Sequence, residues 1–284
     1  MENLELVKIV NVIEENNFKK LAFANENDLD NKELLQKNAT LCKFKSMGFL
    51  SLKLRGCIFE RNTFDNCYFR NAEFIRTSFE GSKFIMCNFS GVKFIGCNLD
   101  YTIFRDCAVD YEAIKESLPT RLNLRKQICK NLAMEHLKLG NTKEYKNFFF
   151  DERESSRKTH KSKFIFKDEY TREKYNIEDA ISGFKNYVLI TIDKELWGYG
   201  EKISTVLRNL IFINVFYFIY FNFFLLIDQN EKIKIGLKEL ILNFMNISTP
   251  DDYIKYWGFI SHRILGILLC GLLIATLFRM VNKR

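Results

Sequence analysis

The sequence contains little histidine, which is common in catalytic sites, and little proline, which is common in disordered linkers. Only three of its 284 residues are histidine, and they lie in separate segments, at His136, His160 and His262. It contains no phosphate-binding loop, nucleophile elbow or metalloprotease helix, so we expect no enzyme activity, no cofactor and no metal. Its two prolines argue against long disordered linkers. The first residues are charged and amphipathic rather than a signal peptide, so we expect the N-terminal part in the cytoplasm.

Cysteine is more frequent, with eight residues, but no two form a CxxC pair and no histidine lies beside them to complete a zinc site. Phenylalanine is the abundant residue, with 28 copies. From residue 44 to residue 109, every fifth residue is large and apolar, which gives fourteen such residues without a break. These positions are Phe44, Phe49, Leu54, Phe59, Phe64, Phe69, Phe74, Phe79, Phe84, Phe89, Phe94, Leu99, Phe104 and Val109.

A second series lies two residues before the first and is mostly small. Its members include Cys57, Cys67, Ala72, Thr77, Ser82, Cys87, Cys97, Thr102 and Cys107. A period of five fits neither the 3.6 residues of a helical turn nor the alternation of an ordinary strand. It indicates a solenoid of square coils with four short sides, in which both series point inward.

Three of these segments, CYFRN at 67–71, AEFIR at 72–76 and CNFSG at 87–91, resemble the pentapeptide-repeat family, whose repeat reads roughly A-[DN]-[LF]-x-x. The resemblance implies a right-handed quadrilateral parallel β-helix, which we assign to residues 39–118. Residues 1–38 are then expected to form a helical N-terminal cap over the open end of the solenoid, with helices in 4–24 and 31–38. A partner-binding arm is the alternative for this segment.

The solenoid is expected to bury its cysteines and to carry a mixed surface. Five of them, at 57, 67, 87, 97 and 107, occupy the small inward series, which indicates apolar filler in a reducing compartment. The outward positions carry ten basic and seven acidic side chains. This surface neither imitates DNA nor forms a basic stripe, so we expect no nucleic-acid partner.

After Pro119 the apolar spacing changes to that of a helix. Helices are predicted at 121–139 and at about 142–158, with Gly140 ending the first and Asn141 or Thr142 capping the second. Together they make an antiparallel hairpin. We assign 119–202 to an α-helical linker and a pre-membrane elbow. The basic run at 157–167 is either a solvated segment or one attracted to anionic lipid.

Two apolar segments, 203–227 and 256–280, have the length and composition of membrane crossings. Between them, residues 237–247 are apolar but too short to span, which suits a re-entrant or interfacial helix. We therefore assign 203–284 to a multi-pass domain of two transmembrane helices with a re-entrant pore helix.

Residues 121–284 resemble a bacterial class that joins pentapeptide repeats, a helical linker and a two-transmembrane potassium-channel-like pore domain. The resemblance is carried by the hairpin at 132–154, by LWGYGEK at 196–202 and by the last helix, ending GLLIATLFRMVNKR. It implies a homo-oligomer, most simply a homotetramer, in the lipid bilayer of the cell (inner) membrane. Both termini would be cytoplasmic, and an unidentified cytoplasmic protein or ligand could bind the repeat domain.

The region aligned with that family's ion filter departs from its pattern. The pore or filter candidates are Asn246, Ser248, Thr249, Pro250, Asp251 and Asp252. Both glycines of the family's filter are missing, and Pro250 restricts the backbone. Rings of Asp251 and Asp252 in a fourfold assembly would favour cations without close selection.

Four small residues in the last helix, Gly266, Cys270, Gly271 and Ala275, form pairs four apart that suit helix packing or a hinge, with Gly271 the better hinge. His262 is interpreted either as a pH sensor or as a side chain that reaches the membrane interface. The tripeptide Gly-Tyr-Gly at 198–200 spells the family's filter but has charged neighbours. We interpret it as an elbow, with Trp197 and Tyr199 at the lipid headgroups.

These features predict a bacterial membrane ion channel or pore, cation-permeable and not strictly potassium-selective, with a cytoplasmic repeat domain as sensor or scaffold. Two alternatives remain open. One is a non-conducting, membrane-anchored interaction scaffold. The other is a toxin-like effector that depolarises the membrane when the soluble domain is triggered.

Overall fold

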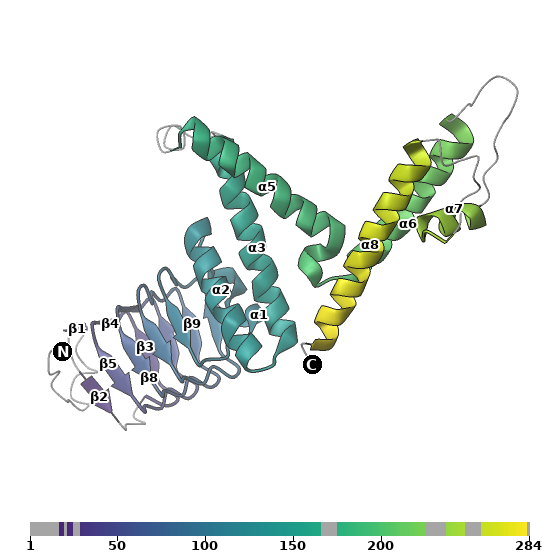
Figure 1. The fold of residues 1–284 in the computed structure, drawn as a ribbon. Coiled ribbons are helices and arrows are strands. Elements are labelled where there is room, and N and C mark those ends of the chain that lie inside the picture. Colours follow the sequence, from purple (N-terminus) through teal and green to yellow (C-terminus); the bar gives the residue numbers. More distant parts are fainter. Residues whose placement is uncertain are drawn as a thin grey trace, which may run out of the picture. The chain divides into compact units, whose positions relative to one another are not determined.

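A computed structural model describes residues 17–19, 22–24, 29–165, 175–224, 237–247 and 257–282 of the chain. The chain divides into two compact units, Met1–Phe184 and Lys185–Arg284. The first unit contains the β-solenoid and a helical hairpin, and the second contains the two apolar helices (Figure 1).

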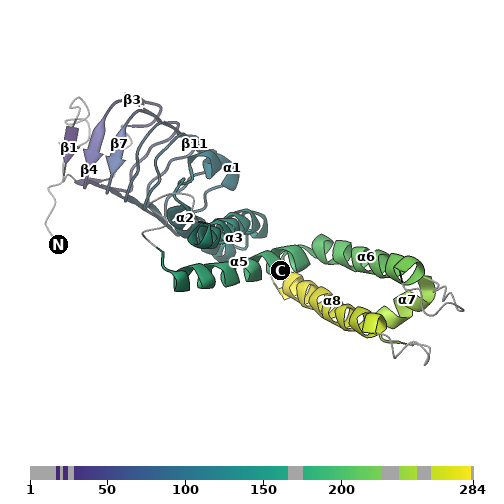
Figure 2. The same ribbon diagram turned by 90° about the horizontal axis from the view of Figure 1, so that it is seen from above.

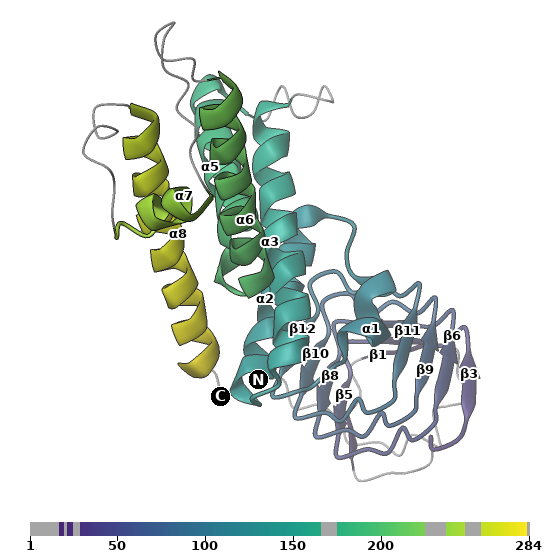
Figure 3. The same cartoon turned by 90° about the vertical axis from the view of Figure 1, so that its right-hand side faces the viewer.

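The first unit begins with a parallel β-solenoid of about four turns, seen close to end-on in Figure 3. Its strands form three sheets, in the orders β1-β4-β7, β12-β10-β8-β5-β2 and β11-β9-β6-β3. Each strand has three residues: β1 Asn17–Lys19, β2 Ala22–Ala24, β3 Glu33–Leu35, β4 Asn38–Thr40, β5 Lys43–Lys45, β6 Lys53–Arg55, β7 Ile58–Glu60, β8 Thr63–Asp65, β9 Glu73–Ile75, β10 Lys83–Ile85, β11 Lys93–Ile95 and β12 Ile103–Arg105.

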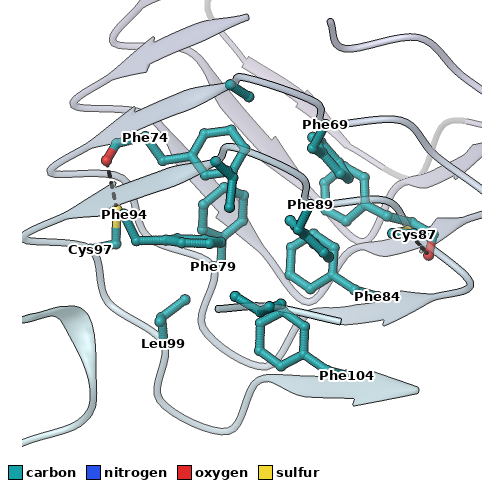
Figure 4. Close-up of a cluster of buried hydrophobic side chains, with 14 of the residues drawn as sticks. Phe69, Phe74, Phe79, Phe84, Cys87, Phe89, Phe94, Cys97, Leu99 and Phe104 are labelled. Atoms are coloured by element: carbon teal, nitrogen blue, oxygen red, sulfur yellow. Dashed lines mark hydrogen bonds between the residues drawn. The ribbon is translucent and has the colours of Figure 1, made fainter. Parts of the chain in front are cut away.

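The five-residue series builds the core, as predicted. Phe84 is in register with Phe64 in the preceding coil and with Phe104 in the next, so one coil takes twenty residues. Their rings stack with centroids 4.8 Å and 5.2 Å apart, and neighbouring columns meet edge to face, as Phe84 and Phe89 do (Figure 4). Burial of these rings supplies the main stabilisation of a unit whose strands are very short.

The prediction of a helix at 31–38 is wrong, because strand β3 lies there and pairs with β6. Leu29, Leu34 and Ala39 are buried and continue the five-residue series backwards from Phe44. Leucine and alanine also fit a helical pattern, which is why the sequence is ambiguous here. Strands β1 and β2 likewise replace predicted helix, and their registers are 21 residues from the next coil rather than twenty. The rest of the predicted cap, before residue 29, lies outside the described residues.

The helical hairpin follows the solenoid as predicted. After the short helix α1 (Tyr111–Ile114) and a 3-10 turn (Lys115–Ser117) come α2 (Leu122–Lys138) and α3 (Thr142–Phe164), which lie side by side (Figure 2). Gly140 has a φ of 71°, and the Asn141 side chain accepts a hydrogen bond from the Glu144 N–H at 3.3 Å. The second helix ends later than the predicted 158, so the basic residues of 157–164 are helical.

The hairpin closes the C-terminal end of the solenoid. The amide of Asn131 on α2 accepts from the Phe104 N–H at 2.9 Å and donates to the Phe104 carbonyl at 2.8 Å. It thereby replaces the backbone of the strand that would come next. Glu135 accepts from the Asp106 N–H at 2.9 Å in the same way. These side chains protect an edge strand that would otherwise expose unpaired backbone groups.

The second unit contains most of α5 (Ile177–Trp197), a 3-10 turn (Gly198–Gly200), α6 (Ile203–Ile219), a π-helical turn (Tyr220–Phe224), α7 (Leu237–Phe244) and α8 (Trp257–Asn282). Among the described residues, two segments are long and apolar enough to cross a membrane, Ile203–Asn222 and Trp257–Val281. Within the first, the amides of Asn214 and Asn222 donate to carbonyls four residues earlier, at 2.8 Å and 2.9 Å. These bonds lower the cost of placing two amides in an apolar segment.

Candidate functional site

The short helix α7 is attached to α8 by one buried amide, that of Asn243. Its Nδ2 donates to Nδ1 of His262 at 3.1 Å and to the Phe259 carbonyl at 3.3 Å. Its Oδ1 accepts from the Arg263 guanidinium at 3.2 Å. Asn243 is 2% exposed, so these bonds lie out of contact with solvent. Both ends of one side chain therefore hold the short helix against the long one.

His262 is enclosed by aromatic rings. Its ring centroid lies 4.6 Å from that of Tyr217 on α6 and 5.1 Å from that of Phe244 on α7. The side chain is fully buried, and its Nε2 has no hydrogen-bond partner among the residues that the structure describes. The prediction that His262 extends to an interface is therefore wrong, because the aromatic residues of α6 and α7 cover it.

Gly266 lies one helical turn after His262 and permits the approach of α7. A methyl group on Gly266 would overlap the carbonyl oxygen of Phe244 and would lie 2.9 Å from its carbonyl carbon. The sequence predicts close packing at Gly266, and the structure identifies the partner as the end of α7. Only a residue without a side chain fits between these two backbones.

The other predicted small residues differ in their surroundings. Gly271 is exposed, and a Cβ added there would meet no atom of the described residues within 4 Å. Cys270 is half-buried and Ala275 is exposed. Of the two glycines, Gly266 therefore packs against α7, and Gly271 does not meet any other described residue.

Of the predicted filter residues, the structure describes only Asn246. It is exposed, follows the end of α7 and has a φ of 58°. Ser248, Thr249, Pro250, Asp251 and Asp252 lie outside the described residues, so their role stays a prediction.

Helix α6 joins the same site through Tyr217, whose hydroxyl lies 2.8 Å from the Ser261 hydroxyl on α8. Phe221 stacks on Phe259 with ring centroids 4.2 Å apart. Asn243, Phe221 and Phe259 are not among the site residues predicted from the sequence. The available signal is the position of Asn243, a polar residue inside an apolar stretch too short to span a membrane.

The opposite end of α8 contacts the elbow at Gly198–Gly200. The Arg279 guanidinium donates to the Tyr199 carbonyl at 3.2 Å, and a methyl group on Gly200 would overlap that guanidinium. Tyr199 has a φ of 59° and is 4% exposed. Its side chain is covered by other residues of the chain. The prediction that Tyr199 reaches the lipid headgroups is therefore wrong. Asn209 on α6 donates to the Glu195 and Leu196 carbonyls, which caps the end of α5.

In the first unit, Asp151 of α3 is the centre of a second polar cluster. Arg125 donates to both of its carboxylate oxygens, at 2.6 Å and 2.5 Å, and the Tyr111 hydroxyl donates at 2.9 Å. Burial opposes ionisation, but the bonds from Arg125 and Tyr111 lower the pKa of Asp151 below its ordinary value. Burial and the bond to Asp151 raise the pKa of Tyr111 to about 12. The cluster lines an open groove of about 690 Å³.

The inward cysteines are free thiols, and they do more than fill space. The Cys97 thiol donates to the Phe74 carbonyl at 3.2 Å, as Figure 4 shows, and Ser82 and Thr102 do the same for carbonyls 23 residues earlier. Burial raises the pKa of Cys97. The bond with Cys87 and burial raise the pKa of Cys107. The small series thus links successive coils through side-chain donors.

Over the described part of the chain, no group of three or more His, Cys, Asp or Glu could hold a metal.

Comparison with known families agrees with this geometry. Residues 72–107 match the family model for pentapeptide repeats, in eight copies. The solenoid is a pentapeptide-repeat domain. No curated protein matches the chain.

Two solved structures are similar to part of the chain. One is a pentapeptide repeat protein (Rfr23) from the cyanobacterium Cyanothece 51142, with 15% identity and a TM-score of 0.27, covering 32% of this chain and 82% of that one. The other is trypsin-treated QnrB1, a plasmid-mediated fluoroquinolone resistance protein, with 16% identity and a TM-score of 0.24. That match covers 34% of this chain and 56% of QnrB1.

Proposed function

We propose that the chain forms a cation-permeable membrane pore as a homotetramer, with the pentapeptide-repeat domain as a cytoplasmic sensor or scaffold. The observation that carries the proposal is the attachment of α7. Helix α7 has eight residues, too few to span a bilayer, and lies between two segments that are long enough. A short helix at membrane depth is tolerated where protein covers it. The bonds of Asn243 and the fit at Gly266 supply that cover.

In this proposal the residues after α7 line the pore. Asn246 begins that segment, and Ser248, Thr249, Pro250, Asp251 and Asp252 continue it in the sequence. Rings of carboxylates favour cations by charge, and the missing glycines argue against close selection of potassium. The lipid bilayer of the cell inner membrane surrounds α6 and α8, and both termini are cytoplasmic. A cytoplasmic protein or ligand would act on the repeat domain.

A second candidate function is a non-conducting scaffold anchored in the membrane. It is favoured by the departure of 246–252 from a glycine-containing filter, since a sequence that has lost conduction is free to lose those glycines. A toxin-like effector would use the same architecture as the pore but would open on a trigger.

Two measurements separate these functions. Native mass in detergent is expected to give a tetramer, and a monomer or dimer contradicts the pore because it cannot enclose a fourfold axis. In cells carrying a voltage-sensitive dye, induction of the full chain is expected to depolarise the membrane. An unchanged potential favours the scaffold. Depolarisation that depends on an added trigger favours the effector.

A further inference from the structure

Helix α5 has an apolar face that the described part of the chain leaves largely exposed. At 100° per residue, Ile177, Ile181, Phe184, Val188 and Ile192 fall within about 80° of the helix circumference. We call these five residues the α5 stripe. Ile177 and Ile181 are 78% and 66% exposed, and Phe184 is 56% exposed although it meets Phe164 edge to face. Leu189 and Leu196 are also exposed and widen the stripe on one side.

The side of α5 that packs against the hairpin is a different one. A methyl group on Gly183 would lie 2.6 Å from the Lys163 Cβ and 3.0 Å from the His160 carbonyl. Gly183 is about 100° from Phe184 on the helix and further from the rest of the stripe. The main contact with α3 therefore lies beside the α5 stripe, and α3 reaches the stripe at Phe184, which stays 56% exposed.

From this arrangement we infer that the α5 stripe lies on the membrane surface, in contact with the apolar boundary of the lipid bilayer. The inference rests on the membrane placement of α6 proposed above. Only the elbow at Gly198–Gly200 and two further residues separate α5 from α6. Asn209, in the first turns of α6, is bonded to the last carbonyls of α5 at 2.5 Å and 2.9 Å. The end of α5 is thus held where α6 would enter the bilayer, which makes the stripe continuous with a lipid-facing surface.

A second copy of the helix fits the stripe less well. A left-handed coiled coil needs apolar residues in alternating steps of three and four. Residues 177, 181, 184 and 188 follow that pattern, but the next two positions are Thr191 and Glu195. The apolar series continues instead at Ile192 and Leu196, the spacing of a straight helix that rests on a flat surface.

The charges of α5 indicate which part of the membrane it contacts. The helix carries four carboxylates against two lysines, and Glu195 lies 3.5 Å from Arg208. With no excess of positive charge, attraction to anionic headgroups cannot hold the helix. Binding through apolar area alone is the remaining mechanism, so contact with lipid should be insensitive to salt.

The test uses tryptophan as a depth probe in the full chain reconstituted into vesicles of a zwitterionic lipid with brominated acyl chains. Trp197 and Trp257, the two native tryptophans, are replaced by phenylalanine. Single tryptophans are then placed on the stripe with Phe184→Trp and on the opposite side with Asn186→Trp, a half-buried position about 160° from Phe184 and about 60° from Leu189. A third variant, Phe212→Trp, reports on α6, where Phe212 is 68% exposed.

Brominated lipid is expected to quench the Phe184→Trp and Phe212→Trp probes, on the order of twofold, and aqueous acrylamide to quench the Asn186→Trp probe. If the α6 probe is quenched by lipid and the stripe probe by acrylamide, the inference fails while the membrane placement stands. If neither is quenched by lipid, the proposed function fails as well. A stripe probe shielded from both quenchers means that protein covers the stripe and also overturns the inference. A second version of the test keeps both native tryptophans. Nitroxide labels on cysteines introduced at 184 and 186, in a Cys270→Ser chain, are compared for their exposure to oxygen, which enters lipid, and to a nickel chelate, which stays in water.

Discussion

The amide of Asn243 fixes the protonation of His262. Because Asn243 Oδ1 accepts from Arg263, its Nδ2 must be the atom that donates to His262 Nδ1 at 3.1 Å. Nδ1 is therefore an acceptor, and the ring proton lies on Nε2. The bond joins α7 to α8 in surroundings of aromatic rings, where an unpaired polar group is costly.

Replacement of this amide should release α7. Asn243→Ala leaves His262 Nδ1 without a donor, and we expect a loss of about 1–3 kcal/mol in the free energy of unfolding. Thermal unfolding in detergent should show a lower Tm, and hydrogen exchange in α7 should be faster. Asn246→Gly is the control, since it removes an exposed amide at a φ that glycine adopts without strain. Equal effects of the two substitutions would show that the buried amide is unimportant.

Gly266 and Gly271 offer a matched pair of substitutions. Gly266→Ala places a methyl group on the Phe244 carbonyl and should displace α7, whereas Gly271→Ala meets nothing within 4 Å among the described residues. Alanine favours a helix over glycine at both positions, so only the packing differs. We expect Gly266→Ala to lower the Tm and to abolish ion flux. If Gly271→Ala is instead the more damaging change in flux, it indicates a hinge or a contact between subunits, and α7 is then not the critical element.

The Asp151 cluster predicts that the hairpin weakens in acid. The folded-state pKa of Asp151 is lowered, so its ionised form contributes stability that is present above the unfolded pKa, which is about 4. That contribution is lost as the pH falls through the lower, folded-state value. Hydrogen exchange in α2 and α3 should accelerate below about pH 4 in the native chain. Asp151→Asn should show faster exchange at pH 7 and a smaller change in acid, and an identical pH profile in both chains would refute the prediction.

The buried thiols should resist alkylation. Seven of the eight cysteines are buried and Cys270 is half-buried. Burial also raises the pKa of Cys97 and Cys129, so little reactive thiolate forms. Iodoacetamide at pH 8 should modify at most Cys270 in the folded chain and all eight cysteines after unfolding, as measured by mass spectrometry. Rapid modification of Cys97 in the folded chain would contradict the solenoid packing.

The sequence predicts regular features better than isolated side-chain contacts. The repeat from Phe44 to Val109 is visible because a period of five matches neither a helix nor a strand, and Gly140 is visible because glycine commonly ends a helix. Leu29 and Leu34 extend the solenoid but escape the prediction, since leucine suits a helix equally well. The bonds of Asn131 to Phe104 have no local pattern, because an amide substitutes for a strand only in three dimensions.

The candidate site is predictable in part for the same reason. Small residues mark close packing, so the sequence indicates Gly266 but not its partner Phe244. The polarity of histidine favours an interface for His262, whereas the aromatic residues that enclose it come from two other helices. The filter candidates from Ser248 to Asp252 remain predictions from sequence.

The most direct test of the pore is ionic current through purified full-length protein in a planar bilayer. We expect discrete openings that pass cations, with little preference between sodium and potassium because the segment after α7 lacks the glycines of a selective filter. Asp251→Asn should reduce cation current by removing one ring of charge. Preference for anions, or no current from protein that is tetrameric in detergent, would contradict a cation pore.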